Sequence, residues 1–252
     1  MMGPIDTHAH VADLPDVDSV VTRAKAAGLS GIVAVSASIP TIEGTLRLTK
    51  QYRNYMHAAL GIHPTEFFNQ DLDAALLLIK INASRCVAIG EIGLDYGHKQ
   101  IRKDKIQRER QTEFYVKQLQ LARDLDLPVS IHSRGAWRDC LELTNKHGPG
   151  KGVFHWYSGP LDVLRDALNA GYYVSCTPAV EVSTDLRAVM IETPLERILI
   201  ETDSPVWIKS LNRPSEPSDV LLTLRHLSEL KGLSQDEVEA ATTRNARAIF
   251  RM

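Results

Sequence analysis

The sequence predicts an α/β protein in which residues 1–252 form one domain, a (β/α)8 TIM barrel. Short apolar runs rich in β-branched residues alternate with helical patterns about eight times along the chain. Several runs, such as Ile32-Val33-Ala34-Val35, are apolar throughout, which is typical of parallel strands buried on both faces. The chain length of 252 residues also matches the roughly 250 residues that this barrel commonly uses.

Each expected strand is a short apolar run that polar residues or glycine bound. In chain order, the strands are expected at residues 4–8, 31–36, 57–63, 86–92, 128–132, 152–155, 172–176 and 197–202. The phosphate-binding motifs of open doubly wound sheets, GxGxxG and GxxxxGK[ST], do not occur in the sequence. The strands are therefore expected to close into a barrel.

The segments between the strands carry apolar residues at helical spacing among charged and amide side chains. Helices are expected at residues 17–27, 42–52, 72–82, 104–126, 137–146, 161–170, 185–191, 219–231 and 234–250. Glycines end several of them, at Gly28, Gly148, Gly171 and Gly232. Ser234 and Glu237 have the spacing of a capping box, which predicts the start of the last helix.

Charge and cysteine content exclude some classes of protein. Lysine and arginine number 29 against 31 acidic residues, so the net charge of -2 provides no broad basic field for coating long nucleic acids. Cys86, Cys140 and Cys176 form no CxxC pair, which argues against a zinc ribbon or a redox motif. The sequence starts without a signal-peptide pattern and contains no apolar run near the ~18 residues of a membrane span. We therefore expect a cytoplasmic protein with no membrane partner.

Histidines and acids gather at the carboxyl ends of the expected strands, which is the rim where TIM barrels build active sites. His8 and His10 are two residues apart, so strand alternation points both imidazoles into the barrel mouth. With them, the candidate metal ligands are Glu91, His132, His155 and Asp203. Four imidazoles and two carboxylates suffice for two ions that share a carboxylate, and they suit zinc, manganese, iron or magnesium. Any one of these histidines alone is more often half-buried structure, but their joint placement at one rim favours a metal site.

Six ordered segments resemble the TatD-type metal-dependent hydrolases of the amidohydrolase superfamily. They are Asp6-Thr7-His8-Ala9-His10, Gly61-Ile62-His63-Pro64, Gly90-Glu91-Ile92-Gly93-Leu94-Asp95-Tyr96, Ile131-His132-Ser133-Arg134, Val153-Phe154-His155-Trp156-Tyr157-Ser158-Gly159 and Ile200-Glu201-Thr202-Asp203-Ser204-Pro205. The resemblance implies a TIM barrel with two divalent metal ions (Mg, Mn or Zn). It also implies phosphodiester hydrolysis, typically 3′→5′ exonuclease action on DNA.

The same resemblance distributes the ligands between the two ions. His8, His10 and Asp203 would hold one, His132 and His155 the other, with Glu91 bridging. Two such ions lower the pKa of a bridging water and clamp the attacking and leaving oxygens. Asp203 is our candidate for the general base, with a purely ligating role as the alternative.

Three further residues are candidates for contact with the substrate. We expect His63 and Arg134 to contact phosphate, the alternatives being a histidine that orients a ligand and an arginine that pairs near the next helix. Trp207 could stack on an unpaired base or pack a loop. Glu201 is expected to point away from the site and to be structural.

Three functions compete. The first is a metal-dependent nuclease acting on DNA ends or short single strands, as a monomer. The second is an ester or amide hydrolase on the same metal site, such as a D-aminoacyl-tRNA deacylase. The third is a non-catalytic binding scaffold, which is disfavoured because no expected ligand is missing.

Overall fold

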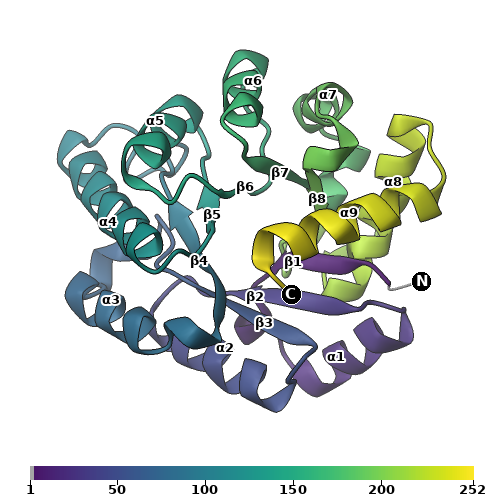
Figure 1. The fold of residues 1–252 in the computed structure, drawn as a ribbon, viewed down its shortest axis with the longest axis horizontal. Coiled ribbons are helices and arrows are strands. Elements are labelled where there is room, and N and C mark those ends of the chain that lie inside the picture. The colour runs from purple at the N-terminus through teal and green to yellow at the C-terminus, as the bar shows by residue number, and fades with distance from the viewer. Residues whose placement is uncertain (1–2) are drawn as a thin grey trace.

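The computed structural model describes residues 3–252, which form a barrel of eight parallel strands (Figure 1). The strands are β1 (Ile5–Ala9), β2 (Gly31–Val35), β3 (Met56–Leu60), β4 (Cys86–Gly93), β5 (Val129–His132), β6 (Gly152–Phe154), β7 (Tyr173–Cys176) and β8 (Ile198–Ile200). Each strand pairs with the next in the chain. The barrel closes where Ala9 bridges Ser204 and where the Thr7 hydroxyl donates to the carbonyl of Ile200 at 3.0 Å. The predicted fold is confirmed.

Helices surround the barrel and link its strands (Figure 1). They are α1 (Val17–Ala26), α2 (Ile39–Gln51), α3 (Leu72–Ile81), α4 (Lys105–Asp124), α5 (Trp137–His147), α6 (Leu161–Asn169), α7 (Thr184–Glu192), α8 (Val220–Lys231) and α9 (Gln235–Phe250). Short 3-10 helices are η1 (Val11–Asp13), η2 (Phe67–Asn69), η3 (Ala83–Arg85), η4 (Pro178–Glu181), η5 (Leu195–Arg197) and η6 (Pro217–Asp219). The predicted capping box of α9 is present, because the Glu237 carboxylate accepts from the Ser234 amide at 2.9 Å.

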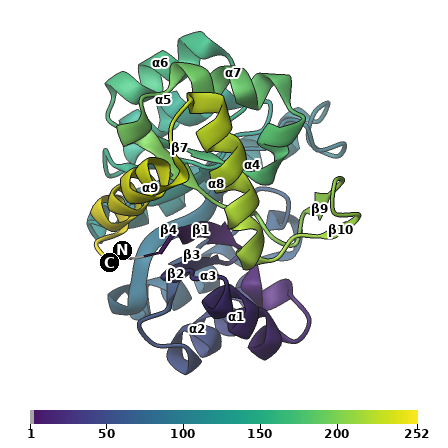
Figure 2. The same cartoon turned by 90° about the vertical axis from the view of Figure 1, so that its right-hand side faces the viewer.

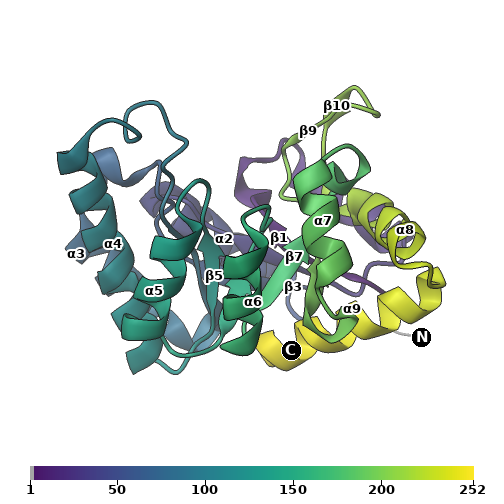
Figure 3. The ribbon, with the colours of Figure 1, turned by 90° about the horizontal axis from the view of Figure 1, so that it is seen from above.

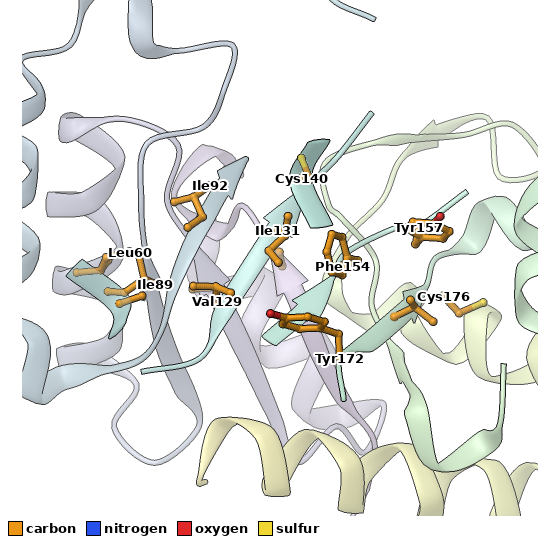
Figure 4. Close-up of a cluster of buried hydrophobic side chains, with 14 of the residues drawn as sticks. Leu60, Ile89, Ile92, Val129, Ile131, Cys140, Phe154, Tyr157, Tyr172 and Cys176 are labelled. Atoms are coloured by element: carbon orange, nitrogen blue, oxygen red, sulfur yellow. The ribbon is translucent and has the colours of Figure 1, made fainter. Parts of the chain in front are cut away.

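Two apolar cores hold the barrel together. The larger lies between strands and helices and includes Ile89, Ile131, Phe154 and Tyr172 (Figure 4). The smaller joins the interior of the barrel to α9, through ten buried residues: Ile5, Val33, Val35, Ala59, Ala88, Val153, Leu199, Ala246, Ile249 and Phe250. The last helix therefore closes one end of the barrel with apolar side chains.

A small hairpin projects at the opposite end from α9 (Figures 2 and 3). It consists of β9 (Trp207–Ile208) and β10 (Arg213–Pro214), and the sequence patterns predicted neither strand. The Ser215 amide donates to the carbonyl of Val206 at 2.7 Å. The Arg213 guanidinium donates to both carboxylate oxygens of Asp219 at 2.7 and 2.8 Å. These contacts fix the hairpin at its base.

No helix within residues 3–252 combines the length and the apolar character needed to cross a membrane.

We predict that Phe250→Ala lowers the free energy of unfolding by about 3 kcal/mol, because it removes a ring that is 2% exposed and leaves a cavity under the barrel. Urea denaturation followed by circular dichroism measures the change. Leu77→Ala, at an exposed position of α3, is the matched control and should stay within about 0.5 kcal/mol of the wild type. Equal effects of the two substitutions would contradict the role assigned to α9.

Candidate metal centre

The carboxylate of Glu91, near the end of β4, lies at the middle of a cluster of imidazoles and is 1% exposed. Its Oε2 is 3.2 Å from Nε2 of both His8 and His10. Its Oε1 is 2.7 Å from Nε2 of His155 and 2.8 Å from Nδ1 of His132. The two oxygens of this carboxylate therefore face different groups of imidazoles.

Asp203 completes the first of these two groups. Its Oδ1 lies 3.6 Å from Nε2 of His8 and 3.5 Å from Nε2 of His10. The backbone of Asp203 has a φ of 52°, in the left-handed region that Asp adopts more readily than most residues. Its amide donates to the carbonyl of His8 at 2.9 Å, so the closure of the barrel between β1 and β8 positions this carboxylate.

His63 lies inside the cluster, beside the second group. Its Nε2 is 3.3 Å from Oε1 of Glu91 and 3.3 Å from Nδ1 of His132. Its Nδ1 is 2.7 Å from the hydroxyl of Thr65, whose amide donates back to the same nitrogen. The side chain expected to contact phosphate is thus also within reach of the metal-ligand candidates.

The ring nitrogens that face away from Glu91 have polar partners of their own. Nδ1 of His8 lies 3.2 Å from the hydroxyl of Ser130, and Nε2 of His132 lies 3.2 Å from Oδ2 of Asp95. Nδ1 of His155 lies 3.2 Å from Oε1 of Glu201. Such partners fix the orientation of an imidazole and increase its basicity, as is usual around metal-ligating histidines.

The expectation that Glu201 points away from the site is wrong. Glu201 and Asp203 are two residues apart, so alternation places both side chains on the same side of the chain. The Glu201 carboxylate also accepts from the backbone amide of Trp156 at 3.0 Å. Glu201 therefore holds both the ring of His155 and the turn that follows β6.

Arg134 pairs with Asp95, a residue to which the sequence analysis gave no role. Its Nε and Nη2 donate to the Asp95 carboxylate at 2.7–3.1 Å, although 60% of the arginine side chain is exposed. Asp95 also accepts from the amides of Gly97 and His98. Burial raises the pKa of Asp95, but hydrogen bonds from His132 and Arg134 outweigh it and keep the pKa well below its usual range. Its place four residues after Glu91 in the same motif is the signal that could have identified it.

The buried carboxylates and imidazoles shift one another's pKa values. Burial lowers the pKa of His10, but hydrogen bonds to Asp203 and Glu91 outweigh it and raise the pKa to about 10. Burial likewise opposes a charged His155, yet the charge of Glu91 and the hydrogen bond to Glu201 raise its pKa well above the usual value. Burial raises the pKa of Glu91, but the neighbouring imidazoles hold it well below its ordinary range. Without metal, His10 and His155 therefore retain their protons at neutral pH, and Glu91 retains its negative charge.

This donor set fits divalent metal ions. Within the described residues, three groups bring their ligand atoms within 4.8 Å of one another: His8, His10 and Glu91; His63, Glu91 and His132; and His8, His155 and Glu201. Imidazole nitrogen and carboxylate oxygen are the ligands that zinc and manganese take in proteins. A buried carboxylate that contacts several imidazoles also needs cationic charge around it, which protons or metal ions can supply.

A cavity of about 540 Å³ opens beside the cluster. His132, His155 and Asp203 line it together with Arg134 and Trp156. This size lies within the roughly 300–1,000 Å³ of small-molecule sites. Trp207 does not line this cavity; its side chain, 59% exposed, lies at a smaller one beside it.

Comparison with known proteins places this arrangement in a family. The family model described as TatD related DNase matches residues 5–251. The human deoxyribonuclease TATDN3 is 32% identical over 99% of this chain and 95% of its own length. The 3'-5' ssDNA/RNA exonuclease TatD of Erwinia amylovora is 30% identical over 93% of each chain. The crystal structure of YJJV, a TatD homologue from Escherichia coli K12, superposes with a TM-score of 0.90 at 28% identity and covers 100% of both chains. The chain therefore belongs to the TatD related DNase family.

Proposed function

We propose that residues 1–252 act as one barrel domain that hydrolyses phosphodiester bonds of DNA, as a metal-dependent 3′→5′ exonuclease. The observation that carries the proposal is the arrangement around Glu91, whose two oxygens face different groups of imidazoles. Two relatives, a human deoxyribonuclease and a 3'-5' ssDNA/RNA exonuclease of Erwinia amylovora, support a nucleic acid substrate.

Two divalent cations would occupy the cluster. His8, His10 and Asp203 would hold one and His132 and His155 the other, with Glu91 shared between them. When bound, such cations lower the pKa of a water molecule and stabilise the negative charge that develops on phosphate oxygens. Mg, Mn and Zn all remain candidates, since availability as well as ligand type decides which ion is bound.

The protein's own residues position the reactants and move the proton. Burial raises the pKa of Asp203, but its hydrogen bond with His10 and the other imidazole charges lower it below the usual value, so this carboxylate is ionised at neutral pH. Asp203 accepts the proton of the attacking water. Arg134 contacts a phosphate oxygen through the nitrogen that Asp95 leaves free, and His63 contacts phosphate beside it. Trp207 contacts the substrate strand outside this cleft.

The charge balance and the cavity favour DNA ends and short single strands over duplex. The net charge of -2 offers no extended field for phosphate backbones, so attraction must be local. The cleft of about 540 Å³ suits an unpaired end better than a duplex, and a monomer contains every residue that the proposal uses.

The proposal predicts that metal-loaded protein releases mononucleotides from the 3′ end of single-stranded DNA. Oligonucleotides labelled at either end, resolved on denaturing gels, distinguish the direction of cleavage. An aminoacyl-tRNA and a simple aryl ester are assayed in parallel. Rapid hydrolysis of either of these without nucleotide release would replace the nuclease by an ester or amide hydrolase.

We predict that Asp203→Asn lowers kcat by about 10²–10⁴-fold, because the amide cannot accept the proton. The rate is measured on 3′-labelled single-stranded DNA at saturating Mn²⁺. Asp124→Asn, at an exposed carboxylate near the end of α4, is the matched control and should retain wild-type kcat. A nearly normal kcat in Asp203→Asn would eliminate the general-base role.

Metal binding should release protons and strengthen as the pH rises. His10, with a pKa of about 10, and His155, with a raised pKa, are protonated at neutral pH without metal, whereas a ligating imidazole must be neutral. Protons therefore compete more strongly at low pH, and we expect tighter Mn²⁺ binding at pH 8 than at pH 6. Calorimetric titrations of metal-free protein in two buffers of different ionisation enthalpy count the protons released. Enthalpies that do not depend on the buffer would contradict the assigned protonation.

Glu201→Gln should weaken metal binding about tenfold, because a neutral amide makes His155 a less basic ligand. The Kd for Mn²⁺ is measured by calorimetry, with the exposed Glu66→Gln as the matched control. An unchanged Kd in Glu201→Gln would mean that this carboxylate supports only the fold.

A further inference from the structure

A second cavity, of about 160 Å³, lies beside the cleft of the metal centre, between η4 and the base of the β9–β10 hairpin. The two cavities have Trp156, Ala179 and Val206 as common walls. The smaller one is otherwise lined by Thr177, Pro178, Glu181, Val182, Thr202, Trp207, Ile208 and Lys209. The cleft that Asp203 and His155 line therefore adjoins this cavity through three shared residues.

The walls of this cavity are largely apolar, and several of its apolar residues are exposed. The side chains of Trp207, Val182 and Val206 are 59%, 68% and 37% exposed. Apolar groups gathered in this way around a hollow indicate a binding surface for an apolar or aromatic group. Trp156 and Trp207 provide flat aromatic surface.

Contacts on the other side of the cavity fix the position of Trp207. The hydroxyl of Ser210 donates to the Glu181 carboxylate at 2.6 Å, which ties the hairpin to η4. Arg213 ties the other end of the hairpin to Asp219. Because these contacts hold both walls, the aromatic surface is in place before a ligand binds.

We propose that this cavity is a nucleobase subsite, in which one base next to the cleaved bond stacks on Trp207. This inference rests on the proposed nuclease function. The volume is below the roughly 300–1,000 Å³ of sites that hold whole drug-sized ligands, and so suits one ring system whose sugar and phosphate remain in the larger cleft. The stack accepts every base, because each base has a π-face.

The test compares single-stranded DNA that carries an ordinary base at each of its last two 3′ positions with DNA abasic at one of them. The wild type should show kcat/KM about tenfold higher with the base present, the cost expected for one lost base–aromatic stack. Trp207→Ala should bring this ratio close to one, and Trp207→Phe should restore part of it. Leu211→Ala, on the same hairpin but outside the cavity, is the matched control and should keep the wild-type ratio.

A binding measurement separates this inference from the proposed function. Metal-loaded protein is titrated with thymidine 5′-monophosphate and with 2-deoxyribose 5-phosphate, which lacks the base. Tighter binding of the nucleotide by the wild type, lost in Trp207→Ala, supports the subsite even if no DNA is hydrolysed. Equal binding of the two compounds, or a base preference that survives in Trp207→Ala, overturns it whether or not the protein is a nuclease.

Discussion

The burial of one carboxylate, Glu91, determines much of the rest of this structure. A charged group at 1% exposure is costly unless cationic partners surround it, and here the partners are imidazoles. His8 and His10 come from the first strand and its end, and His132 and His155 from the fifth strand and the turn after the sixth. The closed barrel brings these distant segments within 3.2 Å of one side chain. The same closure, between β1 and β8, positions the second carboxylate, Asp203.

One end of the barrel is apolar and the other is polar, and the candidate metal centre lies at the polar end. Apolar side chains from α9 pack into one end of the barrel. The mouth holds charged groups, an arginine that is 60% exposed and a projecting hairpin. Ser130, Asp95 and Glu201 orient three imidazoles, which links the catalytic geometry to the strand ends rather than to mobile loops.

The barrel and the gathering of Glu91 with the five other candidate ligands could be predicted because parallel strands bring their carboxyl ends to one rim. Contacts between side chains from different strands were not predictable in this way. The pairing of Arg134 with Asp95 and the position of His63 beside His132 depend on the stagger of neighbouring strands. The two-residue strands β9 and β10 are too short to produce a periodic pattern. The hairpin and the cavity beside its base are therefore visible only in the structure. The prediction for Glu201 was wrong because the side chains of residues two apart point to the same side of an extended chain. Glu201 therefore points to the same side as Asp203.

The number of metal ions bound per chain tests whether two ions share Glu91. Native mass spectrometry of metal-loaded protein should find two ions per chain in the wild type. In Glu91→Gln, one amide cannot replace both carboxylate oxygens, so occupancy should fall to one ion or none while circular dichroism shows the same fold. Two ions bound with unchanged affinity in Glu91→Gln, or a single ion in the wild type at saturating metal, would contradict the account.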